Sequence, residues 1–249
     1  MNKRRKFIKT FLGGGSATAM FLPWMGTKNM ESIRVFASSN ASSPTHTIKK
    51  MKVAYILFDS ITLLDFIGIY DPLSRIKSKK FMEGFSWDVC GVKPSIKDSF
   101  GLEMSIDKIK PDLSTYDMVI IPGGFGTRPL QFDEEFIGWI KTAEKVEYKV
   151  SVCTGSLLLG AAGFLKNKTA TTNFNEYKTL GNYCSNVVEH RIVDDSNVIT
   201  AGAVASSIDL GLYLCEKLVG TENTEEIRKS MNYVPSEFEI VKLNTTTKG

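Results

Sequence analysis

One stretch decides the fold: VSVCTGSLLLG, at residues 150–160. The run Tyr148 to Val152 is rich in β-forming residues, and the run Ser156 to Ala162 is small and compatible with a helix. Cys153 is therefore predicted to lie on the tight turn between a buried strand and a helix. Thr154 and Gly155, which follow it, suit a turn and a close approach of two backbones.

A turn of this kind is a nucleophile elbow. It exposes one side chain at the carboxyl end of a sheet, above the free N–H groups that begin the next helix. Those N–H groups and the helix dipole favour negative charge, so we expect the Cys153 thiol to ionise more readily than a free cysteine. The alternative interpretation is a buried structural cysteine, which is the more common role of this residue.

A second strand, DMVII at residues 117–121, ends in Pro122-Gly123-Gly124. Glycines after a buried strand let the backbone approach a ligand and turn N–H groups toward it. We therefore predict that Gly123 and Gly124, together with Gly155, line a substrate or oxyanion pocket. An ordinary strand-to-loop turn is the alternative. The segment is not a dinucleotide-binding fingerprint, because its third glycine is replaced by Pro129.

A third candidate is Asp65, which follows the apolar strand Met51 to Phe58 and lies between Leu64 and Phe66. A carboxylate among apolar residues is costly unless it is paired or protonated. A carboxylic acid with a raised pKa beside a thiolate is a suitable proton donor. A solvent-facing aspartate or a helix cap would explain the same pattern.

The order of elements predicts an α/β fold with a doubly wound, mostly parallel sheet and helices on both faces. Apolar strands recur near Val53, Trp87, Val119, Val150 and Val198, with a helical pattern at residues 133–140 between two of them. Residues 187–200 are typical of a hairpin, and residues 204–219 and 224–233 of two closing helices. Residues 51–235 are thus predicted to form one domain, followed by a tail at 236–249.

Taken together, these segments resemble the ThiJ/PfpI superfamily, and within it the isonitrile (isocyanide) hydratase branch. The resemblance rests on VCTGSL at 152–157, LGAAGFL at 159–165, ATT at 170–172, LDF at 64–66 with Gly68, and IPGG at 121–124. It extends from about Met51 to Tyr233. It implies a flavodoxin-like fold of the class I glutamine amidotransferase type and a homodimer.

The resemblance also implies a reaction on a small electrophilic substrate. In that branch a cysteine thiolate attacks the terminal carbon of an isonitrile, an aspartate assists proton transfer, and water addition gives an N-substituted formamide. Carried over, Cys153 is the nucleophile, Asp65 the acid/base partner, and Thr154 a hydroxyl that orients water or the thiol. Such an enzyme needs no metal and no cofactor. A redox-sensing or ligand-binding module and a glyoxal-processing enzyme are the alternatives.

The sequence departs from the relatives in three places. Protease-like and related relatives often have histidine directly after the cysteine, where this chain has Thr154, and neither His46 nor His190 is an obvious member of a triad. Asn173-Phe174 stands where hydratase-like relatives often have histidine and tryptophan, and Ile69 where many have proline. These departures concern the substrate and not the fold.

The N-terminus resembles a twin-arginine export signal, with Arg4-Arg5 before Phe7 and an apolar run from Thr10 to Met25. We expect residues 1–37 to be this signal, residues 38–50 a polar linker, and the protein to be exported to the periplasm without a stable membrane insertion. The alternative is an uncleaved membrane-anchoring tail. The chain carries 31 basic and 27 acidic residues. Without the seven basic residues and one acidic residue of 1–37, its net charge is −2, which does not favour a nucleic-acid partner.

Overall fold

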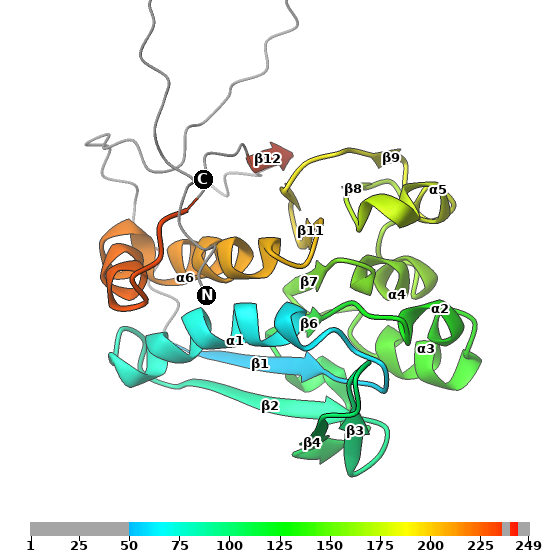
Figure 1. Cartoon of the computed structure of the whole chain (residues 1–249), viewed down its shortest axis with the longest axis horizontal. Coiled ribbons are helices and arrows are strands. Elements are labelled where there is room, and N and C mark those ends of the chain that lie inside the picture. Colours follow the sequence, from blue (N-terminus) through cyan, green and yellow to red (C-terminus); the bar gives the residue numbers. More distant parts are fainter. Residues whose placement is uncertain (1–49, 236–239, 244–249) are drawn as a thin grey trace, which may run out of the picture. The chain divides into compact units, whose positions relative to one another are not determined.

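The computed structural model describes residues 50–235 and 240–243, in which an eight-stranded sheet has the order β12-β10-β11-β7-β6-β1-β2-β5 (Figure 1). All neighbouring strands are parallel except β10 and β11, which are antiparallel. The sheet consists of β1 (Met51–Ile56), β2 (Phe85–Gly91), β5 (Lys108–Ile109), β6 (Met118–Ile121), β7 (Tyr148–Val152), β10 (Ile192–Asp195), β11 (Val198–Ala201) and β12 (Ile240–Leu243).

The helices are α1 (Leu63–Ser78), α2 (Thr127–Leu130), α3 (Glu134–Lys141), α4 (Gly155–Ala161), α5 (Tyr177–Leu180) and α6 (Ser206–Ser230). Two short 3-10 helices are η1 (Leu113–Thr115) and η2 (Phe174–Glu176). Two small two-stranded sheets lie outside the main sheet: one pairs β3 (Ser95–Lys97) with β4 (Glu103–Ser105), and the other pairs β8 (Thr169–Ala170) with β9 (Asn186–Val187). The predicted doubly wound, mostly parallel α/β fold is confirmed.

The five predicted apolar strands are β1, β2, β6, β7 and β11. The helix predicted at 133–140 is α3, and the side chain of Asp133 caps it by accepting a hydrogen bond of 2.9 Å from the Phe136 N–H. Its buried residues Phe136, Ile137, Trp139 and Ile140 repeat at helical spacing, which is why this segment packs on the sheet as a helix.

The direction of the chain reverses between β1 and β6, which are neighbours in the sheet. From β1 the chain crosses through α1 to β2 on one side, whereas from β6 it crosses through α3 to β7 on the other. Because such crossovers are right-handed, α1 and α3 cover opposite faces of the sheet. The carboxyl ends of β1 and β6 therefore form the crevice in which α/β proteins of this type bind ligands.

Helices α1 and α6 lie side by side (Figure 1), and glycines allow their close approach. A Cβ atom on Gly68 would lie 2.0 Å from Ser207 Oγ, and one on Gly211 would lie 2.9 Å from Pro72 Cγ. These close contacts fix the position of α1, whose first turn carries Asp65. Within the described ranges, no helix is long and apolar enough to cross a bilayer.

Two predicted boundaries differ from the structure. Residues 240–243 form strand β12 beside β10 and not part of a tail, because Ile240 is buried in this edge position. The predicted hairpin is confined to β10 and β11, since residues 186–187 pair with β8 instead. The two predicted closing helices form α6, in which Gly220, with a φ of 81°, separates the two helical segments. The predicted signal at 1–37 lies outside the described residues, as does the linker apart from Lys50.

Candidate active site

Cys153 lies on the turn between β7 and α4, as the sequence predicts. Its φ is 53°, a left-handed conformation that is uncommon for a residue other than glycine. Its N–H donates to the Ala201 carbonyl of β11 at 2.8 Å, and its carbonyl accepts from the hydroxyls of Ser156 at 3.1 Å and Thr172 at 2.9 Å. The backbone is thus held in a strained conformation by three contacts, which is typical of a nucleophile elbow.

Asp65 is fully buried in the first turn of α1. It neither faces solvent nor caps the helix, since the N-cap residue is Thr62. Its Oδ2 accepts a hydrogen bond of 2.9 Å from the Gly123 N–H, whereas Oδ1 has no hydrogen-bond partner within the described part of the chain. Burial raises the pKa of this carboxyl to about 7, although the Gly123 N–H and the Cys153 thiol both favour its ionised form.

The expectation of an unusually acidic Cys153 thiol is wrong. Burial, followed by the charge of Asp65, raises the pKa of the thiol to about 12. Cys153 is only 5% exposed, so the loss of hydration outweighs the hydrogen bonds from the Thr154 backbone N–H and the Asn173 side chain, which lower the pKa of the thiol. Cys153 and Asp65 therefore share at least one proton in the resting site at neutral pH.

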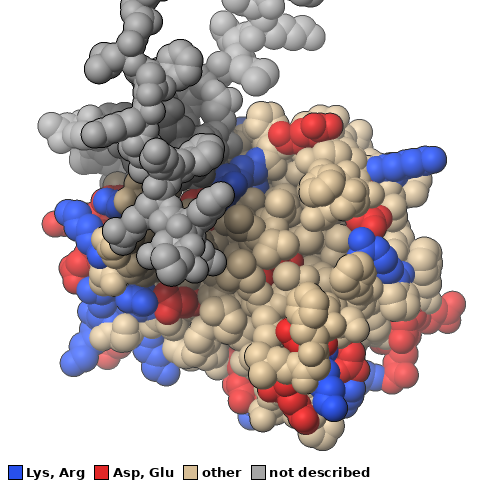
Figure 2. All heavy atoms as spheres, viewed as in Figure 1, with Lys and Arg blue, Asp and Glu red and all other residues tan. Residues whose placement is uncertain are grey.

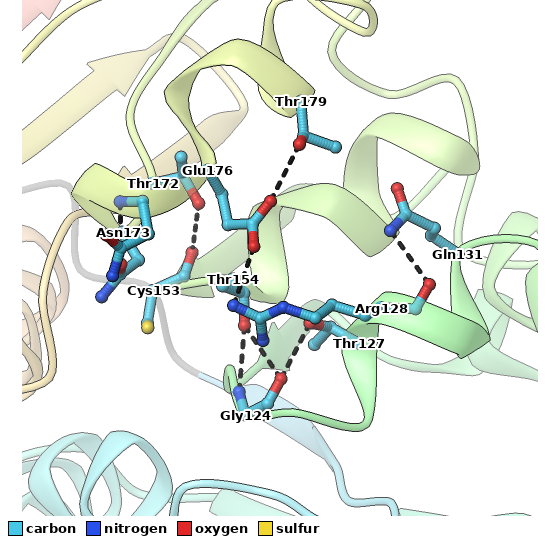
Figure 3. Close-up of polar contacts among 11 residues, drawn as sticks. Gly124, Thr127, Arg128, Gln131, Cys153, Thr154, Thr172, Asn173, Glu176 and Thr179 are labelled. Carbon is cyan, nitrogen blue, oxygen red and sulfur yellow. Dashed lines mark hydrogen bonds and ion pairs between the residues drawn. The ribbon is translucent and has the colours of Figure 1, made fainter.

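The two glycines after β6 form the wall of the site opposite Cys153. A Cβ atom on Gly123 would lie 2.8 Å from Asp65 Oδ2 and 2.8 Å from Cys153 Cβ, so only glycine fits where the backbone packs against these two residues. The Gly123 N–H is already bonded to Asp65. The Gly124 N–H donates to the Thr154 hydroxyl at 3.0 Å, and the same hydroxyl lies 3.1 Å from the Gly124 carbonyl and donates to it (Figure 3).

These contacts define what the predicted pocket residues do in the structure. The N–H groups of Gly123 and Gly124 bond to protein oxygens, so they hold Asp65 and Thr154 in place and do not point freely at a ligand. Gly155 packs against the end of β6, where a Cβ atom would lie 2.1 Å from the Ile121 carbonyl oxygen. Close backbone packing thus accounts for glycine at position 155.

Asn173 is a site residue that the sequence reasoning did not assign, although it was noted as a departure from the relatives. Its side chain interacts with the Cys153 thiol and lies beside it in Figure 3. The segment that carries it is tied to the other side of the site by an ion pair of 2.7 Å between Glu176 and Arg128. The sequence could have indicated this role, because Asn173 directly follows the motif at residues 170–172.

The described contacts of the Cys153 thiol come from Asp65, Thr154 and Asn173, and none of these is a histidine. His190 lies partly exposed in the connection between β9 and β10, and His46 lies outside the described residues. No three possible metal ligands gather anywhere in residues 50–235 and 240–243. The arrangement supports nucleophilic attack by sulfur with proton transfer through a carboxyl group.

A cysteine elbow next to the switch point of a doubly wound sheet, faced by a buried carboxyl group, defines a class of cysteine-centred α/β proteins. Residues 51–217 match the DJ-1/PfpI family, and the chain belongs to that family. This agrees with the predicted ThiJ/PfpI membership.

Individual relatives include an isonitrile hydratase and DJ-1 proteins. The chain is 32% identical to isonitrile hydratase from Pseudomonas putida over 187 residues, which cover 75% of this chain and 80% of that protein. It is 27% identical to DJ-1 homolog A from Arabidopsis thaliana, over 59% of this chain and 39% of that protein. Two solved structures are similar. A ThiJ/PfpI family protein from Pseudomonas syringae has a TM-score of 0.69 and 23% identity, and the match covers 80% of this chain and 83% of that chain. Drosophila melanogaster DJ-1beta has a TM-score of 0.65 and 21% identity, and the match covers 75% of this chain and 100% of that chain.

Proposed function

We propose that this protein hydrates an isonitrile to an N-substituted formamide, with Cys153 as the nucleophile. The observation that carries the proposal is the Asp65 carboxyl group, which is fully buried beside Cys153 with its Oδ1 unpartnered among the described residues. A pKa of about 7 lets this carboxyl group both accept and return a proton near neutral pH. The 32% identity to isonitrile hydratase from Pseudomonas putida supports the choice of substrate class.

The first half of the reaction adds the thiol across the isonitrile carbon. Ionised Asp65 accepts the thiol proton while the Cys153 sulfur forms a bond to the terminal carbon of the isonitrile. The proton then passes from Asp65 to the same carbon, which gives a thioimidate in which carbon is doubly bonded to nitrogen and singly bonded to sulfur. The thiol has a raised pKa, so proton removal by Asp65 must accompany the attack.

The second half consumes water. A water molecule adds to the thioimidate carbon, one of its protons goes to the nitrogen, and the carbon–sulfur bond breaks. The other proton returns through Asp65 to the leaving sulfur, which regenerates the thiol and releases the formamide. The sum is one isonitrile plus one water, with no change of oxidation state, so neither an oxidant nor a cofactor is required.

Thr154 acts in this scheme by holding the site together and not by moving a proton. Its hydroxyl bonds both the N–H and the carbonyl of Gly124, while its backbone N–H faces the Cys153 sulfur and favours the thiolate. Gly123 lets the backbone pack against both Asp65 and Cys153, and its N–H holds the Asp65 carboxyl group in place.

The test is a turnover assay on the purified protein with an alkyl isonitrile, an aryl isonitrile and methylglyoxal. We expect formamide from at least one isonitrile and none from the Cys153→Ala variant. Consumption of methylglyoxal alone would assign the site to aldehyde chemistry. Oxidation of Cys153 by peroxide with no turnover of any of the three compounds would identify a redox-sensing module.

We also propose that two copies of the chain associate through α1. Leu64 and Ile67 are apolar, lie on this helix next to Asp65, and are 48% and 42% exposed. Burial of such side chains against a second copy would remove apolar surface from water. Sedimentation equilibrium of the protein and of a Leu64→Asp, Ile67→Asp variant tests this, and a monomeric parent protein would contradict it.

Export by the twin-arginine route is a further proposal and rests on the sequence of residues 1–25. Replacing Arg4 and Arg5 with lysine should leave the precursor in the cytoplasm. Unchanged export of that variant would remove the proposal.

A further inference from the structure

The side-chain amide of Asn173 has its oxygen bonded within its own segment, which leaves its NH₂ group available. It is the N-cap residue of η2, and its Oδ1 accepts a hydrogen bond of 3.1 Å from the Asn175 N–H. A backbone N–H can bond only to the oxygen of the amide, so this contact assigns the orientation of the group. The NH₂ end is therefore the part of the side chain that remains available to the neighbouring Cys153 sulfur (Figure 3).

The segment around Asn173 is anchored on both sides. The hydroxyl of Thr172, the preceding residue, donates to the Cys153 carbonyl at 2.9 Å. Three residues further on, Glu176 accepts from the Thr179 hydroxyl at 2.8 Å and pairs with Arg128 at 2.7 Å. Arg128 belongs to α2, which begins shortly after Gly124. These contacts restrict the position of Asn173 relative to the sulfur (Figure 3).

We propose that Asn173 is a neutral side-chain hydrogen-bond donor that, beside the Thr154 backbone N–H, stabilises negative charge on the Cys153 sulfur, so that it is a further catalytic residue of this site. The sulfur is buried and faces the carboxylate of Asp65, so it needs donors that compensate for lost hydration. The amide supplies a donor without a charge of its own and does not titrate. Arg128 and Glu176, the charged residues that anchor the segment around Asn173, form an ion pair and so neutralise each other.

The role extends the proposed function, on which its catalytic meaning rests. Attack by sulfur and its later departure both place negative charge on this atom, so a donor beside it stabilises both transition states. The interaction between Asn173 and the thiol also lowers the pKa of Cys153, in the direction that the role requires. A residue that served only to cap η2 would have no effect on the reactivity of the sulfur.

The experiment measures the rate at which Cys153 is alkylated by iodoacetamide at about pH 8, which needs no isonitrile. Asn173→Asp keeps an oxygen for the Asn175 N–H and the shape of the side chain, but replaces the donor with a negative oxygen. We expect alkylation to slow by about tenfold or more, the effect of losing a hydrogen bond to a charged group. Asn175→Asp is the matched control, because it adds the same charge to the exposed neighbour in η2 and should change the rate less than about twofold.

Asn173→Ser provides a second variant that adds no charge. Its hydroxyl can still cap η2, but it is too short to reach the sulfur, so it should also slow alkylation. If both variants react at the rate of the parent protein, the role of Asn173 is refuted. Slowed alkylation of the two variants, together with a parent protein that turns over no isonitrile, would retain the role of Asn173 and refute the proposed function, so the two failures are distinguishable.

Discussion

Asp65→Asn is the substitution that tests the electrostatics of the site most directly. The amide oxygen of the asparagine can accept the hydrogen bond of 2.9 Å that the Gly123 N–H now gives to Asp65 Oδ2. Its NH₂ group takes the place of the unpartnered Oδ1, so the shape of the side chain is preserved and only the titration is lost. Any pH-dependent difference between the two proteins therefore reports the ionisation of Asp65.

The size of that difference follows from the pKa. Burial raises the pKa of Asp65 from 3.8 to about 7 in the folded protein. Below about pH 4 the group is protonated in both the folded and the unfolded states. Between these two values only the unfolded chain releases its proton, so the contribution of Asp65 to the free energy of unfolding falls as the pH rises toward 7. A shift of about three pKa units corresponds to about 4 kcal/mol.

The asparagine variant does not titrate. Its free energy of unfolding relative to the parent protein should therefore increase by about 4 kcal/mol between about pH 4 and pH 8. Any fixed cost of burying the amide cancels in this comparison. The assay is urea unfolding of both proteins at several pH values. A difference that stays constant over this range would show that Asp65 ionises as an ordinary surface carboxylate does.

The same variant should lose about a hundred- to ten-thousand-fold of the isonitrile turnover, because general acid/base help is removed. The turnover of the parent protein should rise with pH through about 7, as Asp65 becomes able to accept the thiol proton. Parent-like turnover by Asp65→Asn would exclude this residue from the chemistry.

Two further substitutions test the walls of the site. Gly123→Ala should abolish turnover, because its Cβ would lie 2.8 Å from Asp65 Oδ2. The control is Gly138→Ala on α3, where no atom lies within 4 Å of the added Cβ; it should keep full turnover and raise the free energy of unfolding by up to about 1 kcal/mol. Equal activities of the two variants would contradict this account of the site. Thr154→Val leaves the buried Gly124 N–H without its acceptor and should lower the free energy of unfolding, measured by urea denaturation, by about 1–3 kcal/mol. Thr154→Ser keeps the hydroxyl and should restore the stability. An unchanged stability of the valine variant would show that this hydrogen bond contributes nothing.

Elements that depend on a few neighbouring residues could be predicted from the sequence, whereas elements that depend on distant pairing could not. Strand β7 and the turn at Cys153 were predicted from a β-rich run followed by small residues, and they form at those positions because both preferences act over a few neighbouring residues. Strand β12 was assigned to a tail, since its pairing with β10 joins residues far apart in the sequence. On the face drawn in Figure 2, Lys and Arg side chains lie among Asp and Glu side chains, and residues of other types make up the rest of the surface.

The sequence by itself determined that a cysteine would lie on an elbow, that two glycines would follow a neighbouring strand, and that an aspartate would lie in an apolar run. Only the tertiary structure decided how these groups affect one another. The Cys153 thiol is less acidic than a free cysteine and the Asp65 carboxyl has a pKa of about 7, because the packed domain removes water from both and places them side by side. Desolvation and charge proximity depend on the whole fold, whereas the elbow depends on the geometry of a few consecutive residues.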